Sequence, residues 1–491
     1  MIDASNRRYF RISRWIAAAA FLVLSLSLAA AQSRGGDGGA GIPFVRENAP
    51  SFSSFTLSNG IPVFVKRSDA NRVLNVSLVL REGGEAGPER AGWTKLALAT
   101  MARASASYAY DEVVELLDST SSSIGISSTF EYGALSLNVL DKYFERLFPV
   151  WADMAVNPGF RPEDFSQAKN ELELAVQSKD QDPWSFAGKT MNALFFQGHP
   201  YATNPDGTEA SLGAARLEDM KAWHGEAFGA ERLFVTAVGS FDPEVLKSLL
   251  EPTIGSIPRR NLKPAAKAPD FSASPARGLA AEAHDQSKGT IYLRGDFPAP
   301  SPSEPDYMAA SLAMKLFSDL LFTVVRDGYG AVYTPGALIR GFGANYGSIS
   351  IYKTQAPEKI KSYIDEAAGI LAGGRCVSVD PGRPGEESRF MRLEEALESY
   401  KRMYANEYFA AVRTNAAVGR LMISSVLRTG DPSDWLYDVP RIRSLTPAQV
   451  AKAFDDYVLK GNFTWVAVGD QNLLDRLPPG QFKGFGKGSA P

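Results

Sequence analysis

Apolar residues recur along the chain with two spacings, and each spacing predicts a different element. Alternation with a period of two predicts strands within residues 59–67 (NGIPVFVKR), 75–84 (NVSLVLREGG) and 128–140 (STFEYGALSLNVL). Apolar residues gathered on one helical face predict helices within residues 110–120, 141–156, 161–182 and 217–228. A mostly apolar strand is predicted within residues 231–243. The first half of the chain therefore mixes strands with helices.

The second half repeats this order, with strands predicted within residues 289–300, 345–353 and 461–470 and helices within residues 307–328 and 446–458. When one half is slid by 230 residues, Met220 falls on Val450, and Gly239 of FVTAVGS falls on Gly469 of TWVAVGD. We therefore predict two homologous lobes, residues 53–262 and 286–480, joined by an exposed Pro-, Ala- and Ser-rich linker, residues 263–285. Each lobe is expected to be an α+β unit, whose mainly antiparallel sheet has helices on one face and leaves the other face open.

The N-terminus has the order of a secretory signal peptide. Four arginines between positions 7 and 14 precede an apolar stretch, which ends in small residues at Ala29 and Ala31. We predict that residues 1–31 are cleaved near Ala31, that residues 32–52 are a flexible lead-in, and that the protein is periplasmic or secreted. The alternative is a permanent membrane anchor, but about 20 apolar residues are wanted to span a bilayer, so no stable insertion is expected.

Composition excludes several classes of function. The formal net charge is −3, and the 52 basic residues are spread along the chain, which argues against a nucleic-acid partner. Cys376 is the single cysteine, so neither an internal disulfide nor a thiolate zinc cluster can form. Its surroundings, GGRCVSVDPGRPG, have the composition of a loop without histidine, which argues against a nucleophilic role. Export without disulfides fits a periplasm-like compartment.

Several short motifs, taken in order, resemble the pitrilysin/insulinase family of zinc peptidases, which includes mitochondrial processing peptidase. They are LSNGIPVFV, REGG, SSTFEYGALSL, NPGFRPEDF, DQDP, GHPYATNPDGT, the two Val-Gly strand ends and VRDGYGAVYT. The resemblance covers nearly all of the chain after the predicted signal peptide. It implies a metallohydrolase fold of the LuxS and processing-peptidase type, in which paired lobes enclose a chamber.

Active members of that family carry His-x-x-Glu-His on a helix, because histidines four residues apart can hold one zinc ion while the glutamate acts as general base. Aligned with AGWTKLALATM, the first histidine becomes Lys95, the glutamate becomes Leu98 and the second histidine becomes Ala99. On a later helix Glu171 fits the first of two glutamates seven residues apart, and Ser178 stands where the zinc ligand belongs. A protonated lysine has no lone pair for a metal. We therefore expect no metal in this chain.

The three histidines offer no replacement site. His199 lies in the GHPY turn, His224 on a predicted helix and His284 in the polar linker, and the closest pair is 25 residues apart in sequence. No pair has helical or short-loop ligand spacing. We expect His224 to be an ordinary surface or partly buried histidine.

The second lobe keeps a different family feature. Arg326 and Tyr333 in VRDGYGAVY match the family's R-x-x-x-G-x-x-Y pair. In active members this pair reaches across from an opposite lobe, and it binds the substrate backbone and the developing oxyanion. The alternative is that Arg326 ends a helix and Tyr333 packs in the next strand for folding alone.

Loss of the metal motif beside an intact Arg and Tyr spacing predicts a division of labour. We expect a non-catalytic, substrate-binding subunit of a heteromeric peptidase, with Arg326 and Tyr333 serving a peptide bound at the zinc of a homologous His-x-x-Glu-His partner. The chain would need no cofactor of its own and would be inactive alone. Two alternatives stay open: a peptide-binding or scaffold protein without proteolysis, and a lone peptidase with unrecognised ligands.

Overall fold

The structure is a computed structural model that describes residues 43–82, 87–263, 278–379, 389–482 and 484–485. The predicted signal peptide and its cleavage position lie outside the described residues. The first lobe contains a six-stranded sheet in the order β1-β2-β6-β3-β5-β4. Its strands are β1 (Phe52–Thr56), β2 (Pro62–Arg67), β3 (Val73–Arg81), β4 (Ser123–Ser128), β5 (Tyr132–Leu140) and β6 (Leu233–Gly239). Its helices are α3 (Trp93–Met101), α4 (Tyr110–Thr120), α5 (Phe144–Val156), α6 (Pro162–Gln181), α7 (Pro183–Phe195), α8 (Glu209–Ala214), α9 (Leu217–Ala227) and α10 (Pro243–Leu250).

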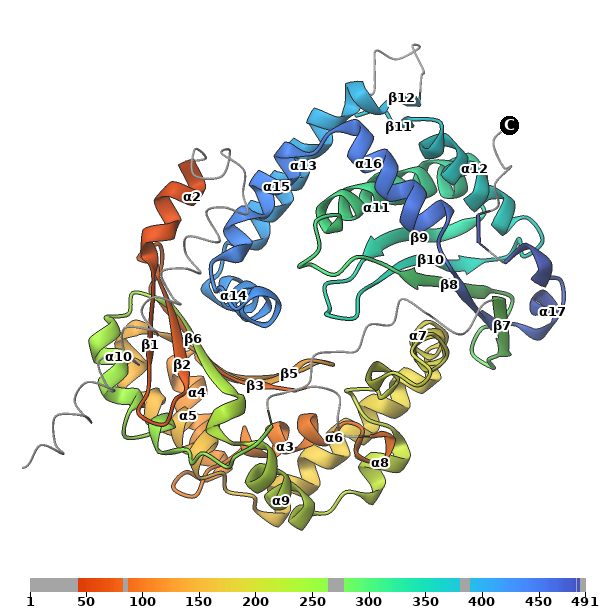
Figure 1. The fold of residues 1–491 in the computed structure, drawn as a ribbon. Helices are drawn as coiled ribbons and strands as arrows, with labels where there is room; N and C mark the ends of the chain where they lie inside the picture. Colours follow the sequence, from red (N-terminus) through yellow and green to blue (C-terminus); the bar gives the residue numbers. More distant parts are fainter. Residues whose placement is uncertain (1–42, 83–86, 264–277, 380–388, 483, 486–491) are drawn as a thin grey trace, which may run out of the picture.

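The second lobe contains a five-stranded sheet in the order β7-β13-β8-β10-β9 (Figure 1). Its strands are β7 (Gly278–Ala283), β8 (Ile291–Pro298), β9 (Val332–Ile339), β10 (Tyr346–Thr354) and β13 (Thr464–Gly469), with a separate hairpin of β11 (Arg375–Val377) and β12 (Phe390–Arg392). Its helices are α11 (Tyr307–Leu321), which continues as a π-helical turn (Phe322–Gly328), α12 (Ile360–Ala372), α13 (Leu393–Ala411), α14 (Asn415–Thr429), α15 (Asp438–Ser444), α16 (Pro447–Phe454) and α17 (Gln471–Leu474).

Apart from β1, which adds an antiparallel edge strand to the first sheet, the two sheets share one strand order, which supports the predicted repeat. In each sheet one parallel pair, β2 with β6 or β7 with β13, is followed by antiparallel pairs. The repeat glycines occupy equivalent places: a Cβ atom at Gly239 would lie 2.5 Å from the Leu74 side chain, and one at Gly469 would lie 2.7 Å from the Thr290 carbonyl oxygen. Both strand ends therefore approach the neighbouring strand too closely for a larger residue. The α+β class with two mainly antiparallel sheets is confirmed.

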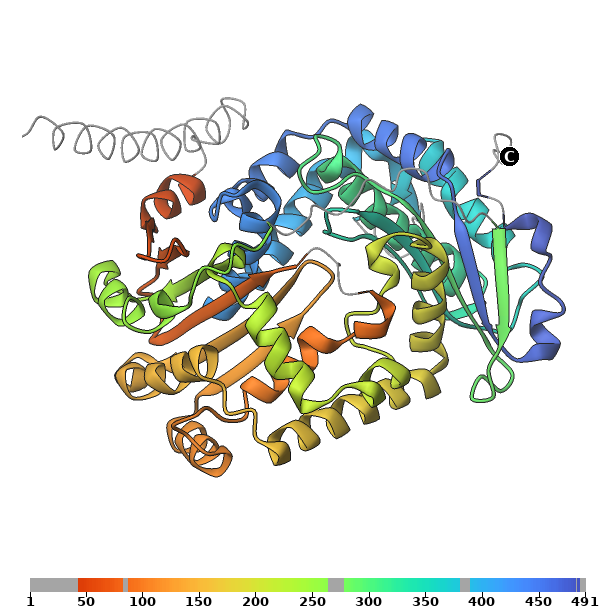
Figure 2. The same cartoon turned by 60° about the horizontal axis from the view of Figure 1, so that its bottom comes forward.

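The prediction of one open sheet face needs correction, because each lobe lends a helix to the other. Helix α14 of the second lobe packs on the first sheet, where Ile423 and Val426 meet Val79 and Phe234 (Figure 1). Helix α7 of the first lobe packs on the second sheet in the same way. The view in Figure 2 shows α7 running beside the second sheet. Burial on both faces explains why β3 and β6 are nearly continuous apolar runs.

The predicted segment boundaries also change. The sequence predicts a flexible lead-in over residues 32–52, but helix α2 (Pro43–Asn48) buries Val45 against α14 and its surroundings, and β1 starts at Phe52. Residues 278–283 were assigned to the linker, but they form the edge strand β7. The stretch predicted as one strand over residues 128–140 is a turn followed by β5, and β4 before it was not predicted.

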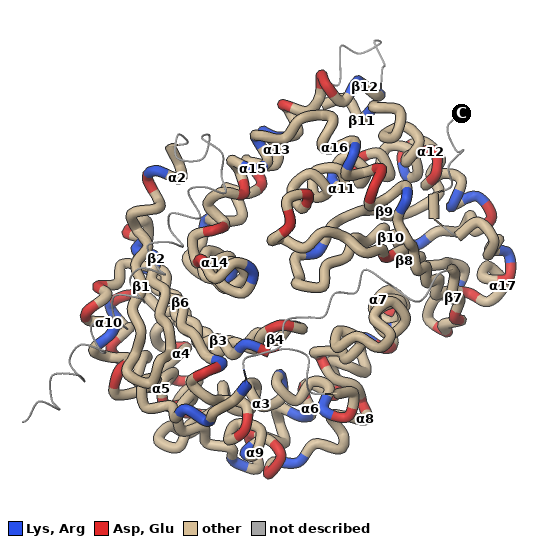
Figure 3. Tube along the Cα trace, in the orientation of Figure 1, with Lys and Arg blue, Asp and Glu red and all other residues tan. Residues whose placement is uncertain are grey.

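Helix α11 with its π-helical turn, Tyr307–Gly328, is long and apolar enough to cross a membrane, with a mean hydropathy of 1.6. It is the only such helix within the described residues, and 67% of its apolar window is buried in the protein. Because it forms the centre of the second-lobe core, its composition is explained by packing. Lys and Arg are interspersed with Asp and Glu over both lobes, and no stripe of one sign stands out in the coloured part of the chain in Figure 3.

Candidate functional site

Helix α3, which carries the aligned zinc-motif positions, is fixed at its first turn. Gly92 precedes the helix with φ +77°, and a Cβ atom there would lie 2.5 Å from the Cα atom of Gly207. The Ser211 hydroxyl donates to the Ala91 carbonyl oxygen at 2.9 Å, and the Trp93 indole N–H donates to the Ser211 carbonyl oxygen at 3.2 Å. The start of α3 is therefore locked against the loop of Gly207 and helix α8.

Lys95, at the position of the first histidine, belongs to an ionic cluster. Its ammonium donates to Asp206 Oδ1 at 2.6 Å, and Lys179 of α6 donates to Asp206 Oδ2 at 2.5 Å. Burial raises the pKa of Asp206, but the hydrogen bonds from Lys179 and Lys95 outweigh burial and hold this pKa below its usual value. The cluster ties α3 to α6 through the loop between α7 and α8. Asp206 was not found by sequence reasoning, since the turn TNPDGT does not show what it faces.

Leu98 and Ala99, at the positions of the glutamate and the second histidine, face the first-lobe core. Leu98 is 1% exposed, and a Cβ atom at Gly133 of β5 would lie 2.8 Å from its Cδ1 atom. Ala99 is half-buried against the same core. Both positions therefore serve packing between the helix and the sheet.

Ser178, at the position expected for the last zinc ligand, is exposed on α6. The α6 residue that reaches the Lys95 cluster is its neighbour Lys179. The neighbouring position on the same face of α6, one helical turn before Lys179, is Ala175. An alanine side chain has no atom that binds a metal, so this position cannot supply the missing ligand either. Glu171 accepts from Arg103 at 3.3 Å instead of joining the cluster. The structure thus does not bring Ser178 and Glu171 together with Lys95.

The residues at this position do not fit a zinc ion. Zinc takes histidine, cysteine or carboxylate ligands in a tetrahedral set. The aligned side chains are a charge-paired lysine, a buried leucine and an alanine, and the described residues contain no group of three His, Cys, Asp or Glu side chains placed to hold a metal.

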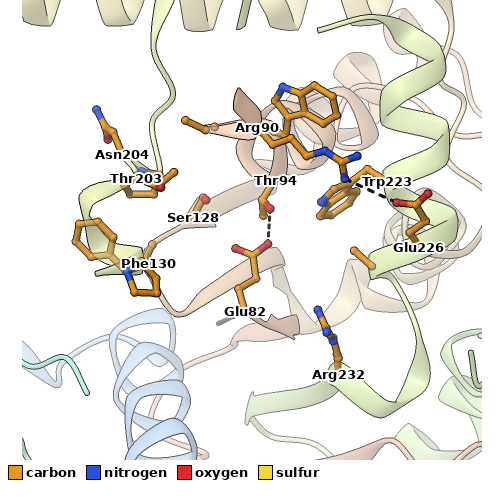
Figure 4. A pocket seen from close by; sticks show the side chains of 17 residues that line it. Glu82, Arg90, Thr94, Ser128, Phe130, Thr203, Asn204, Trp223, Glu226 and Arg232 are labelled. Atoms are coloured by element: carbon orange, nitrogen blue, oxygen red, sulfur yellow. Dashed lines mark hydrogen bonds and ion pairs between the residues drawn. The ribbon is translucent and has the colours of Figure 1, made fainter. Parts of the chain in front are cut away.

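A cavity of about 280 Å³ opens beside the first turn of α3 (Figure 4). Glu82, at the end of β3, points into it and accepts a short hydrogen bond from the Thr94 hydroxyl. Burial raises the pKa of Glu82 to about 7, and the Thr94 hydroxyl and the charge of Arg232 oppose this rise only in part. On the far wall, Arg90 lies over the Trp93 ring at 5.2 Å. The letters REGG match the family motif, but they do not show that Glu82 is partly buried and lines a cavity.

A second cavity, of about 440 Å³, continues from the first and reaches the second lobe. Both cavities share Phe130 in the turn between β4 and β5. Next to it, the Glu131 carboxylate accepts from the Tyr201 hydroxyl at 2.5 Å and from the Gly343 N–H at 2.6 Å. Gly343 lies in the loop between β9 and β10, so this network joins the two lobes at the edge of the cavity.

Arg326 and Tyr333 both lie at the surface of the second lobe. Their contacts among the described residues do not include the Lys95 cluster. Arg326 is exposed at the end of the π-helical turn, with its guanidinium 4.3 Å from the centre of the Phe322 ring. Tyr333 on the edge strand β9 is 69% exposed, and its ring centre lies 6.3 Å from that of Tyr352. Within the described residues, Arg326 forms no ion pair. Neither side chain is consumed by packing.

The histidines have local partners. His199 Nδ1 accepts a backbone N–H at 3.1 Å. The Nε2 atoms of His224 and His284 lie 3.1 and 3.0 Å from the carbonyl oxygens of Ala155 and Asp180. Burial lowers the pKa of His224, so this ring stays neutral more readily than a free one. His284 was placed in a polar linker, but it follows β7 and contacts the end of α6, joining the lobes.

Cys376 is fully buried on β11 instead of lying in a loop. Burial, with the nearby carboxylates of Asp319 and Glu394, raises the pKa of its thiol to about 12. A thiol that stays protonated is a poor nucleophile, in agreement with the sequence prediction.

Comparison with known proteins gives one family and one fold. Residues 214–372 match the model of the peptidase M16 inactive domain. An uncharacterised zinc protease of Mycobacterium leprae is 21% identical over 325 residues, which cover 65% of this chain and 72% of that protein.

Two solved structures share the fold. The peptidase M16 inactive domain from Pseudomonas fluorescens has a TM-score of 0.72 at 17% identity, over 86% of this chain and 98% of that one. A chain of complex III2 from Candida albicans has a TM-score of 0.70 at 15% identity, over 88% of this chain and 98% of that one. These matches confirm the resemblance found in the sequence: the chain is a degenerate homologue of the M16 peptidases, the pitrilysin/insulinase type, with other residues at the zinc positions.

Proposed function

We propose that this protein is the non-catalytic, substrate-binding subunit of a heteromeric M16 peptidase in the periplasm or outside the cell. One observation carries the proposal: the aligned metal positions are filled by a salt cluster and by core packing, while Arg326 and Tyr333 remain exposed. A purely structural protein would not need both Tyr333 and Arg326 to stay exposed. A partner with an intact His-x-x-Glu-His motif would hold the zinc.

A peptide is the substrate class that this architecture suits. Strand β4 is the edge of the first sheet and, within the described residues, pairs only with β5. An extended peptide can add to such an edge through its main chain. Ser128, at the end of β4, lines the cavity beside α3, so a peptide paired with β4 would lie along this cavity.

The test is reconstitution with a homologous His-x-x-Glu-His subunit from the same source. The chain alone should show negligible peptidase activity, and the mixture should cleave peptides. Tyr333→Phe should lower kcat of the mixture by roughly 100-fold, because loss of one oxyanion donor costs this much in other enzymes.

Tyr329→Phe is the matched control, since Tyr329 is also exposed but donates to Glu366 at 2.7 Å. It should leave the rate unchanged. Equal rates for Tyr333→Phe and the unmodified chain would refute the role in trans.

The alternative is a peptide-binding or scaffold protein without proteolysis. The fold match to a chain of complex III2 from Candida albicans supports this alternative, since that chain is part of an assembly. Co-purification from the native source separates the two readings: a partner with zinc and peptidase activity supports the first, and an assembly without either supports the second.

A further inference from the structure

Strand β10 contains a bulge directly opposite Tyr333. Ile351 pairs with Leu293 of β8, but the next pair is Thr354 with Ile291, so two residues of β10 face one residue of β8. The inserted residue, Lys353, has φ +61°, a left-handed conformation that residues with a side chain rarely adopt. A bulge bends the strand that contains it, and bulges next to functional sites can re-aim a side chain.

The bulge coincides with a break in the alternation of β9. Pro335 and Ala337 face the second-lobe core, so alternation would turn Tyr333 into that core as well. Instead Val332 occupies the core position and Tyr333 is 69% exposed. In the β9–β10 register, Tyr352 pairs with Thr334 and Thr354 pairs with Val332, which leaves Lys353 opposite Tyr333.

The exposed ring also has a platform built by both lobes. The Tyr352 ring centre lies 5.8 Å from that of Trp184, on α7 of the first lobe, and 5.1 Å from that of Tyr292, and both contacts are edge-to-face. The Tyr333 ring centre lies 6.3 Å from that of Tyr352, and the two rings are tilted relative to each other. The Lys353 ammonium lies 5.5 Å from the Tyr352 ring centre. Packing of α7 against Tyr352 therefore fixes the orientation of the ring that Tyr333 contacts.

We propose that Lys353 and Tyr352 are positioning residues, and that the backbone bulge at Lys353 aims the Tyr333 phenol at the substrate. This inference rests on the proposed function of Tyr333. It predicts that the left-handed backbone at position 353 matters and the lysine side chain does not. Lys353→Gly keeps this conformation without strain, whereas a β-branched residue in Lys353→Val resists it.

The first measurement is structural and needs no partner. Tetranitromethane nitration of the full chain, followed by peptide mapping, reports the accessibility of each tyrosine. Tyr333 should nitrate at the unmodified rate in Lys353→Gly, and roughly 5-fold or more slowly in Lys353→Val, because alternation would return the ring to the core. Tyr110, on α4 of the first lobe and 39% exposed, is the internal reference. Unchanged nitration of Tyr333 in Lys353→Val overturns the proposal.

The second measurement is kcat in the reconstituted mixture. Lys353→Val should lower it by roughly 10- to 100-fold, since small misplacements of a catalytic group cost this much, and Lys353→Gly should not. Adding Lys353→Val to Tyr333→Phe should cause no further loss. Ser121→Val, at another left-handed residue (φ 51°) in the first lobe, is the matched control for strain and should leave kcat unchanged.

The outcomes are distinguishable. If Tyr333→Phe lowers kcat but Lys353→Val does not, the positioning role is refuted while the proposed function stands. If Tyr333→Phe itself has no effect, the proposed function is refuted, and the catalytic meaning of the bulge with it.

Discussion

Glu82 is a carboxylic acid that lines the cavity beside α3, and burial raises its pKa to about 7. A folded-state pKa above the unfolded value of about 4.5 means that the folded protein holds the proton more tightly. Proton binding at Glu82 therefore stabilises the folded protein below pH 4.5, and this stabilisation is lost as the pH rises through 7. Glu82→Gln stays neutral, so it should match the unmodified protein at pH 5 and exceed it at pH 8 by up to about 3 kcal/mol.

Urea unfolding of both proteins at pH 5 and pH 8 checks this expectation. Glu89→Gln removes an exposed carboxylate a few residues away and should leave the pH dependence unchanged. Parallel pH dependence of Glu82→Gln and the unmodified protein would show that Glu82 ionises normally in the folded state.

Helix α3 carries packing residues at the positions that align with the family's zinc motif. Leu98 is 1% exposed and packs against Gly133, so returning the family glutamate in Leu98→Glu would bury an unpaired carboxylate and remove apolar packing. The free energy of unfolding should fall by at least about 3 kcal/mol, measured by urea unfolding. Leu174→Glu is the matched control: Leu174 is 65% exposed on α6, and its substitution should change stability by less than about 0.5 kcal/mol. Equal effects of the two substitutions would contradict the packing role of Leu98.

The sequence could predict the features that leave a regular pattern of apolar residues or a recognisable motif. The 230-residue repeat, together with alternating or nearly continuous apolar runs, found most central strands, because a central strand buries the side chains of one or both faces. The edge strands β4 and β9 were missed, since SIGISS and VYTPGALI carry small, polar or proline residues where an edge allows them. The replacement of the zinc motif was visible by alignment alone. The Lys95–Asp206–Lys179 cluster was not, because a motif does not show which loop a helix faces.

Helix exchange between lobes was also beyond the sequence, for a physical reason. An amphipathic pattern shows that a helix has an apolar face, but it does not show which sheet that face meets. Helix α7 follows α6 in the first lobe, yet its buried residues Ala187, Met191 and Phe195 pack with Val466 and Val468 of the second sheet. Each sheet face that was predicted to be open is therefore covered by a helix of the other lobe.

This exchange predicts how the whole molecule behaves when it is divided. Residues 43–263 and 278–485, produced as separate polypeptides, should each expose an apolar sheet face and a helix and should associate with 1:1 stoichiometry, measured by analytical ultracentrifugation. Met191 is fully buried between the lobes, so Met191→Asp should weaken association roughly 30-fold or more, because burying an unpaired carboxylate costs at least about 2 kcal/mol. Val245→Asp, at a residue 56% exposed on α10, should not weaken it. Two halves that stay monomeric and soluble would mean that each lobe closes its own sheet and that the helix exchange contributes little to the fold.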